Sequence, residues 1–265
     1  EIELLLEGIF RQYGYDFRAY AYASIRRRLW KHMIAHGVRT VSGLQERVLH
    51  DGEAMDRLLL DLSVNVTAMY RDPRFYQVFR EVVVPRLRTY PFLRIWHAGC
   101  STGEEVVSMA ILLHEEGLYE RTRVYATDIN EAVLQRARTG IFPLERMQEY
   151  TENYIRAGGR RSFSESYTAK YDGALFSPGL LGNVVFSQHN LATDRSFAEF
   201  NVIVCRNVLI YFDRTLQAHV HGLFYDSLAT FGVLGLGSKE SLRLSPFDDC
   251  YEPLPGGEKL YRKVR

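Results

Sequence analysis

The segment from residue 98 to residue 105, Ala-Gly-Cys-Ser-Thr-Gly-Glu-Glu, has the composition of a loop that could hold a ligand. Its glycines would let the backbone approach a ligand closely, at a place where a strand passes into a helix. The spacing is not the Gly-x-Gly-x-x-Gly of dinucleotide-binding proteins, and no Lys-Ser or Lys-Thr pair follows Gly103, as a phosphate-binding loop requires. Glu104 and Glu105 stand where a pyrophosphate would have to lie, so the loop favours a ligand with an ammonium or sulfonium charge. A tight turn whose two acids stabilise the start of a helix is the alternative interpretation.

Asp128 closes the next apolar run, residues 123–129, and is the second candidate. A carboxylate at the carboxyl end of a strand can accept hydrogen bonds from both hydroxyls of a ribose, and Asp128 follows the glycine loop by about 25–30 residues, near the spacing that such folds use. Capping of the following helix, beside Asn130, is the alternative role. Together the two motifs indicate a nucleoside held without a phosphate clamp. S-adenosylmethionine, with a ribose, an adenine, a sulfonium and an amino acid head but no phosphate, fits this description.

Two further polar segments follow or join the predicted elements. The segment Cys-Arg-Asn-Val-Leu-Ile-Tyr-Phe-Asp at 205–213 comes directly after an apolar run. Ligands of open parallel sheets bind beyond the carboxyl ends of the strands, which makes Arg206, Asn207 and Tyr211 candidates. A core aromatic role for Tyr211 and a surface ion pair for Arg206 are the alternatives. The segment Asn-Val-Thr-Ala-Met-Tyr-Arg-Asp at 65–72 lies between two helical patterns, where it could bind a ligand or simply cap the helices.

The pattern of apolar residues predicts an α/β fold with two domains. Residues 1–88 read as helical throughout, whereas residues 89–265 alternate strands with helices, as a doubly wound parallel sheet requires. Residues 142–182 interrupt this alternation with Gly, Ser and Tyr, and we expect an inserted β-subdomain of short strands there rather than another long helix. Strands are expected at 93–99, 123–129, 184–187, 201–205, 233–237 and 259–263, the last forming an antiparallel edge pair, and helices at 104–116 and 213–230.

The composition is that of an ordinary globular protein. Of the 265 residues, 46% are hydrophobic and 25% are charged, which excludes a disordered chain, a collagen-like chain and a coiled-coil rod. No apolar run approaches the length of a membrane span and no basic-then-apolar leader is visible, so we expect a cytoplasmic protein. The three cysteines are far apart, which argues against a disulfide framework. We expect no metal site, because His219 and His221, two residues apart on a helix, would not share a face.

Positive charge gathers in one segment, although the net charge of the chain is only +1. Within six residues of one predicted helix stand Arg26, Arg27, Arg28 and Lys31. Residues 27, 28 and 31 would share a face, opposite an apolar stripe, and we expect this face to be solvated. It could be ordinary surface, or it could steer and hold an anionic substrate.

Five motifs, in one order, give the chain a family resemblance. Asn-x-Thr-x-x-x-Arg, Ser-Thr-Gly-Glu-Glu, Ala-Thr-Asp-Ile, His-Asn-Leu and Cys-Arg-Asn-Val-x-Ile-Tyr-Phe follow one another between residues 65 and 212. Over residues 5–265 the sequence thereby resembles the CheR-type chemoreceptor glutamate methyltransferases. The resemblance implies a Rossmann-like methyltransferase domain, a small all-α N-terminal domain and an inserted β-subdomain. It also implies methyl transfer from S-adenosylmethionine to glutamates in the cytoplasmic domain of methyl-accepting chemoreceptors, with S-adenosylhomocysteine as the product. The protein is then expected to be a monomer without a nucleic-acid partner.

By position, the resemblance also implies a role for each motif residue. Arg71 and Tyr211 would be the catalytic side chains, Asp128 would hold the ribose, and Asn190 with Leu191 would flank the adenine. The implied cofactor contacts are Asn65, Thr67, Arg71, Glu105, Asp128, Asn190, Leu191, Arg206 and Asn207. Since a segment with several glutamates is anionic, Arg26, Arg27, Arg28 and Lys31 are the expected substrate contacts. The chain departs from the family pattern at Met69 and at Val106-Val107, where aromatic and Pro-aromatic residues are usual, and we expect both departures to affect packing near the cofactor.

Two other functions stay open on the sequence alone. A methyltransferase could act on a nucleic acid or a small molecule, and the basic run is compatible with a phosphate backbone. The chain could also be a non-catalytic sensor that binds the cofactor, although nearly all of the motif residues are present. Glutamate methylation agrees with the lack of a Cys–His or Ser–His–Asp constellation in the motifs. A glutamate side chain, with an ordinary pKa of about 4.3, is already an anion at neutral pH and needs no general base.

Overall fold

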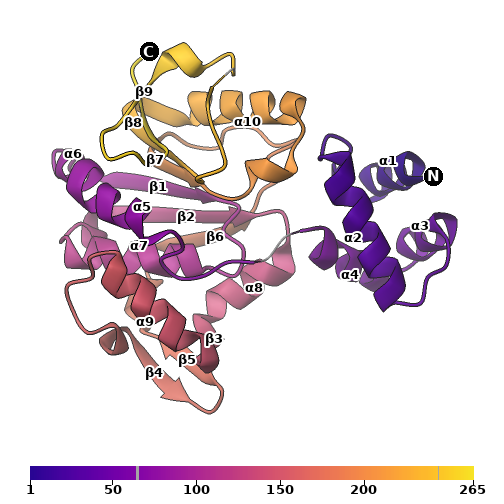
Figure 1. Cartoon of the computed structure of the whole chain (residues 1–265), viewed down its shortest axis with the longest axis horizontal. Helices are drawn as coiled ribbons and strands as arrows, with labels where there is room; N and C mark the ends of the chain where they lie inside the picture. The colour runs from indigo at the N-terminus through magenta and orange to yellow at the C-terminus, as the bar shows by residue number, and fades with distance from the viewer. Residues whose placement is uncertain (64–65, 244) are drawn as a thin grey trace.

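The computed structural model describes residues 1–63, 66–243 and 245–265, so the predicted cofactor contact Asn65 lies outside the described residues. Four helices form a separate N-terminal group at one end of the molecule (Figure 1). They are α1 (Ile2–Tyr13), α2 (Tyr22–Ala35), α3 (Val41–His50) and α4 (Gly52–Leu62). Each carries an apolar stripe, and the stripes meet in one core that includes Leu5, Leu29, Leu44 and Leu58. The side chains of Thr40 and Asp51 cap α3 and α4.

A seven-stranded sheet forms the centre of the larger domain. Its strand order is β6-β2-β1-β7-β8-β10-β9. The first five strands in this order are parallel, and β10 and β9 close one edge in the antiparallel sense. The strands are β1 (Leu93–Ala98), β2 (Thr122–Asp128), β6 (Val184–Gln188), β7 (Phe200–Cys205), β8 (Leu228–Leu236), β9 (Tyr251–Pro253) and β10 (Leu260–Lys263). The predicted doubly wound α/β fold is confirmed.

Both faces of the sheet are covered, which explains why its central strands are apolar almost throughout. Successive residues of β1 point to opposite faces, so Ile95 and Trp96 belong to two different hydrophobic cores. The core around Ile95 includes α7 (Glu104–Glu115) and α8 (Glu131–Thr139), and the core around Trp96 includes α10 (Arg214–Ser227). The expected helix at 213–230 ends earlier, because β8 begins at Leu228 and is longer than the strand that we predicted at 233–237.

The helical segment before the sheet packs differently from our prediction. We expected residues 1–88 to form the helical domain. The segment made of α5 (Pro73–Val78), a π-helical turn (Phe79–Val83) and α6 (Val84–Leu87) instead contributes its buried side chains to the core around Ile95. The chain therefore passes from the core of the four N-terminal helices to the core around Ile95 between residues 62 and 68. The helical pattern of the sequence did not show which of these two cores α5 and α6 join.

The interruption at 142–182 is a small subdomain next to the main sheet (Figure 1). Three short antiparallel strands pair in the order β3-β5-β4, with β3 at Ile141–Pro143, β4 at Tyr167–Lys170 and β5 at Gly173–Phe176. We predicted short strands there but not the helix α9 (Met147–Arg156), which buries Met147, Tyr150 and Tyr154. Within the described ranges, no helix combines the length and the apolar character needed to cross a bilayer.

Candidate active site

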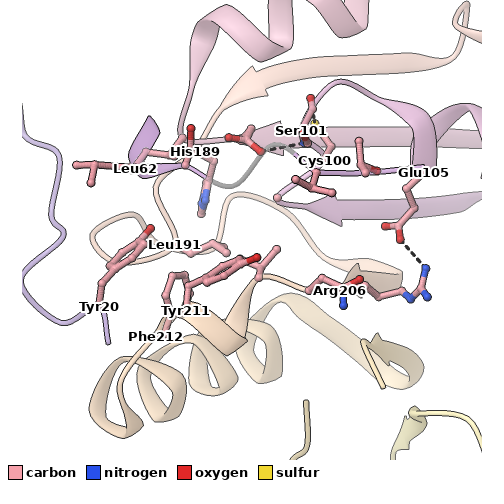
Figure 2. A pocket seen from close by; sticks show the side chains of 18 of the residues that line it. Tyr20, Leu62, Cys100, Ser101, Glu105, His189, Leu191, Arg206, Tyr211 and Phe212 are labelled. Carbon is pink, nitrogen blue, oxygen red and sulfur yellow. Dashed lines mark hydrogen bonds and ion pairs between the residues drawn. The ribbon is translucent and has the colours of Figure 1, made fainter. Parts of the chain in front are cut away.

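A cavity opens at the carboxyl ends of β1, β2 and β7, with about 910 Å³ of empty space up to and including its mouth. This edge of an open parallel sheet is where ligands bind in such folds. The N-terminal helices complete the wall, since Tyr20, Arg28 and Leu62 also line the cavity. Figure 2 shows Tyr20 at one end of the cavity and the pair Glu105 and Arg206 at the other. The site is thus built from both parts of the chain.

Gly99 brings two loops of the cavity into contact. Its φ angle is +81°, in the left-handed region, and a Cβ atom at this position would lie 2.5 Å from Cγ2 of Val208. Any other residue here would be strained by the φ angle, and its Cβ would push against the side chain of Val208. The backbone N–H groups of Gly99 and Cys100 both donate to the carbonyl of Thr127 at 2.8 Å, which ties the loop after β1 to the end of β2.

Asp128 lies at the end of β2 and is almost completely buried. Its Oδ2 accepts the N–H of Ser101 at 2.9 Å, and its Oδ1 accepts the N–H of Asn130 at 3.1 Å. Burial raises the pKa of Asp128, and the hydrogen bonds from Ser101 and Asn130 oppose that rise. A carboxylate oxygen can accept a second hydrogen bond, so Asp128 can serve both as a brace for the two loops and as an acceptor for ribose hydroxyls.

Glu105 belongs to a buried ionic network. Its Oε1 accepts from Nδ1 of His97 at 3.0 Å, and its Oε2 accepts from Arg206 at 2.9 Å. Arg206 also donates to Oδ2 of Asp72 at 2.8 Å and stacks on the ring of Phe75. Burial alone would raise the pKa of Glu105, but the hydrogen bond from His97 and the charge of Arg206 outweigh it, and the pKa lies below its ordinary value. Glu105 is therefore an anion in the cavity wall.

Glu104 does not share this position, contrary to our view of the two acids as a pair facing the ligand. It is buried away from the cavity lining and accepts a hydrogen bond from the hydroxyl of Thr102 at 2.6 Å. Burial raises the pKa of Glu104. Successive helical residues point about 100° apart, so only one of two adjacent acids in α7 can face the cavity.

Glu240, which the sequence analysis missed, holds the loop after β7. It is buried, and its two carboxylate oxygens accept the backbone N–H groups of Gly237, Asn207, Val208 and Leu209 at 2.6–3.0 Å. Asn207 has a φ angle of +61°, a conformation that Asn adopts more readily than most residues. The loop that presents Arg206, Asn207 and Val208 to the cavity is thus held in shape by Glu240, which follows β8 rather than β7.

The loop after β6 contributes the predicted adenine contacts. Asn190 forms a local turn, in which its Oδ1 accepts the N–H of Ala192 at 3.0 Å and its own N–H donates to Asp194 at 2.8 Å. This turn places Asn190 and the nearly buried Leu191 in the cavity lining. Leu191 offers an apolar surface of the kind that the flat face of an adenine can contact.

Arg28 lies inside the cavity rather than on a solvated face, which corrects our expectation for the basic run. One of its guanidinium nitrogens donates to the carbonyl of Leu62, and its Cζ lies 4.5 Å from the centre of the Tyr211 ring. Residue 28 follows the buried stripe of α2, which also contains Ile25, Leu29 and His32 at spacings of three and four. Arg26, Arg27 and Lys31 are exposed as predicted.

The remaining predicted residues meet in the same place. Thr67, Arg71, Glu105, Asp128, Asn190, Leu191, Arg206, Asn207 and Tyr211 all line the cavity. Arg71 donates to the carbonyl of Val66 at 2.9 Å, and its side chain is half-buried. The lining combines the carboxylates of Glu105 and Asp128 and apolar surfaces with three arginines, of which Arg206 pairs with Glu105. This mixture suits S-adenosylmethionine, whose amino acid head carries both an ammonium and a carboxylate. The buried hydroxyl of Ser101 also has no hydrogen-bond partner among the described residues, so it is available to a ligand.

The sheet order and the cavity define a Rossmann-like methyltransferase domain, which follows an all-α domain in the sequence. The chain belongs to the CheR methyltransferase family: residues 1–63 match the family model "CheR methyltransferase, all-alpha domain" and residues 65–252 match "CheR methyltransferase, SAM binding domain". It is therefore a methyltransferase with a domain that binds S-adenosylmethionine. A Pseudomonas putida relative, Cher3, is 52% identical over 99% of this chain and 96% of its own length.

Two further relatives are named "Chemotaxis protein methyltransferase". The one from Listeria innocua is 31% identical over 90% of this chain and 88% of its own length. The one from Escherichia coli is 32% identical over 75% of this chain and 68% of its own length. Both similarities cover at least three quarters of this chain.

Proposed function

We propose that this chain is a protein-glutamate O-methyltransferase that acts in the cytoplasm on the signalling domain of methyl-accepting chemoreceptors. The observation that carries the proposal is the pair of Arg28 and Tyr211 in a cavity that also contains Arg71. A guanidinium and a phenolic hydroxyl are donors suited to a carboxylate acceptor. The names of the relatives from Listeria innocua and Escherichia coli support chemotaxis as the setting.

One set of cavity residues would bind the cofactor, and another set would orient the acceptor glutamate. When bound, S-adenosylmethionine supplies a methyl group on a sulfonium, which becomes a neutral thioether after transfer. Asp128 and Ser101 would hold the ribose, Glu105 would face the cationic amino acid end, and Leu191 would contact the adenine. Each of these side chains is fixed by hydrogen bonds or burial before any ligand arrives, so the site loses little freedom on binding.

The acceptor needs orientation rather than activation. A glutamate carboxylate is an anion at neutral pH, so one of its oxygens can form the new bond to the methyl carbon while the bond to sulfur breaks. Arg71 and Tyr211 would place that oxygen in line with the breaking bond, an effect that can supply on the order of 7–11 kcal/mol. No side chain has to remove a proton.

The test is a transfer assay with tritiated methyl S-adenosylmethionine, the full chain and a chemoreceptor cytoplasmic domain. The proposal predicts counts on the receptor domain that mild base releases as methanol, because carboxyl esters hydrolyse easily. A receptor domain with its acceptor glutamates replaced by alanine serves as the control and should take up no counts. Counts that survive base would indicate another acceptor and refute the proposal. Binding of the cofactor without any transfer to receptor domains would also refute it.

A further inference from the structure

A cluster of metal-ligating side chains lies outside the cavity. His32 on α2 and His36, the residue directly after this helix, approach Asp61 in the last turn of α4. Nδ1 of His32 is 2.6 Å from Oδ2 of Asp61, and Nε2 of His36 is 3.9 Å from the same oxygen. The two imidazole rings are tilted by 40° to each other, with centres 4.3 Å apart. One donor atom from each residue falls within 4.8 Å of the other two.

The backbone explains why these three residues meet. The N–H of His36 donates to the carbonyl of His32 at 3.0 Å, so the helical spacing continues to His36 and puts both rings on one side of α2. The helices α2 and α4 run next to each other in the N-terminal group, which brings Asp61 to that side (Figure 1). Because His32 is buried while His36 and Asp61 are each about 40% exposed, one ligand is fixed and two can adjust.

We propose that His32, His36 and Asp61 form a binding site for a divalent transition-metal ion, with Zn²⁺ as the preferred ion. Two imidazoles and a carboxylate are ligands that Zn²⁺ accepts at about 2.0–2.2 Å in a tetrahedral arrangement. Donor atoms around such an ion would be about 3.3–3.6 Å apart. The observed separations of 2.6 and 3.9 Å lie on either side of this range, so small rotations of the exposed His36 and Asp61 side chains complete the site. A water molecule would take the fourth position.

The proposed metal site is directly connected to the wall of the cavity. Asp61 comes directly before Leu62, whose carbonyl accepts from Arg28 in the cavity wall. A metal ion between α2 and α4 would hold this wall more firmly, so the folded state should gain stability when the ion binds. The ordinary alternative is a hydrogen bond between His32 and Asp61 alone. The two interpretations differ in what they require of His36, which is needed only for a metal ion.

The experiment uses the full chain without an affinity tag, after treatment with a chelator and under reducing conditions. Zn²⁺ is titrated in competition with a chromophoric chelator, Co²⁺ is followed by its visible absorption, and the midpoint of thermal unfolding is measured with and without Zn²⁺. We expect one ion per chain, a tetrahedral Co²⁺ spectrum and a rise of several degrees in the midpoint. His36→Ala should keep the fold and weaken Zn²⁺ binding at least tenfold, and Asp61→Asn should weaken it similarly.

The matched control is His50→Ala, which removes an exposed histidine of the neighbouring helix α3. It should bind Zn²⁺ as the unchanged chain does. Equal Zn²⁺ affinity in His36→Ala would overturn the proposal, and so would the lack of stoichiometric binding at micromolar Zn²⁺. A Co²⁺ spectrum dominated by thiolate charge transfer would also overturn it, because it would place the ion on a cysteine.

Discussion

Asp128 connects the two loops of the cavity and is the residue on which our account of cofactor binding depends. Asp128→Asn keeps the shape of the side chain but removes its charge, and its amide group cannot accept at both positions. We expect the affinity for S-adenosylmethionine to fall by about 2 kcal/mol, or roughly 30-fold, as for the loss of a hydrogen bond to a charged group. Isothermal titration calorimetry measures this change. Asp226→Asn, at an exposed position of α10, is the control, and equal affinities in all three proteins would exclude the ribose assignment.

Tyr211 offers a test of acceptor positioning that is separate from cofactor binding. Its ring lies under the guanidinium of Arg28 and lines the cavity. Tyr211→Phe keeps the ring and removes only the hydroxyl. We expect kcat to fall while the affinity for S-adenosylmethionine stays nearly constant, the signature of an interaction made in the transition state.

Steady-state kinetics with a receptor domain, together with calorimetry, provide the two readouts for Tyr211. Tyr225→Phe, which alters a tyrosine stacked on Phe247 away from the cavity, should leave both unchanged. If Tyr211→Phe turned over as fast as the unchanged enzyme, Tyr211 would be a packing residue.

The sequence revealed the polar residues at the strand ends but not all of their partners. Asp128 and Glu105 could be found because strand, loop and helix follow one another along the chain. Glu240 could not, because its four acceptor contacts join the end of β8 to the loop after β7. The buried position of Arg28 likewise depends on how α2 meets Tyr211. Short sequence motifs carry no information on contacts between distant segments.

At the scale of elements, α10 shows how one helix separates two histidines. His219 is exposed, whereas His221 is buried and has no hydrogen-bond partner among the described residues. The two residues do not share a face, as their spacing of two predicts. Burial lowers the pKa of His221 from its ordinary 6.5 to about 4. The folded chain therefore keeps this imidazole neutral at pH values where the unfolded chain protonates it.

This difference predicts how stability depends on pH. Because the pKa of His221 is lower in the folded state, its protonation favours unfolding, and stability is lost as the pH falls from about 6.5 to about 4. Between pH 7.5 and pH 5 the loss attributable to His221 should be about 2 kcal/mol. His221→Leu should remove this part of the pH dependence, which urea unfolding at the two pH values measures. His219→Gln should retain it, and identical pH dependence in His221→Leu would contradict the account.

The boundaries of elements were less predictable than their kinds. The strand–helix alternation after residue 89 could be predicted because apolar runs and helical stripes differ in period. The helix α9 was missed although Met147, Tyr150 and Tyr154 recur at helical spacing, because the glycines and serines around it suggested turns. The packing of α5 and α6 on the sheet could not be predicted, since an apolar stripe does not specify which of two cores it joins.

At the scale of the whole molecule, the basic run of α2 divides between two environments. Arg26, Arg27 and Lys31 are exposed to solvent on the helical domain, whereas Arg28 lines the cavity. We therefore expect Arg27 and Lys31, four residues apart and both exposed, to attract an anionic receptor segment toward the site. Reversing both to glutamate should raise the KM for a receptor domain roughly 3- to 10-fold and leave cofactor affinity unchanged.

Salt and a matched reversal provide the controls for this effect. The KM of the unchanged enzyme should rise with salt, because the Debye length shrinks from about 10 Å at 0.1 M to about 3 Å at 1 M. Arg94 and Arg123 are exposed and pair across the neighbouring strands β1 and β2, at the ends of the strands away from the cavity. Their reversal makes the same change in net charge and should not affect KM. An equal effect of both reversals would make the basic run ordinary surface.

The most direct test of the central claim is mass spectrometry of a chemoreceptor cytoplasmic domain after incubation with this protein and S-adenosylmethionine. We predict a mass increase of one CH₂ unit at glutamate side chains of the receptor, which mild base reverses. The increase should be absent when Asp128→Asn replaces the unchanged enzyme at low cofactor concentration. Methylation located on lysine, arginine or a backbone nitrogen, or an unmodified receptor domain in the presence of an enzyme that binds the cofactor, would contradict the claim.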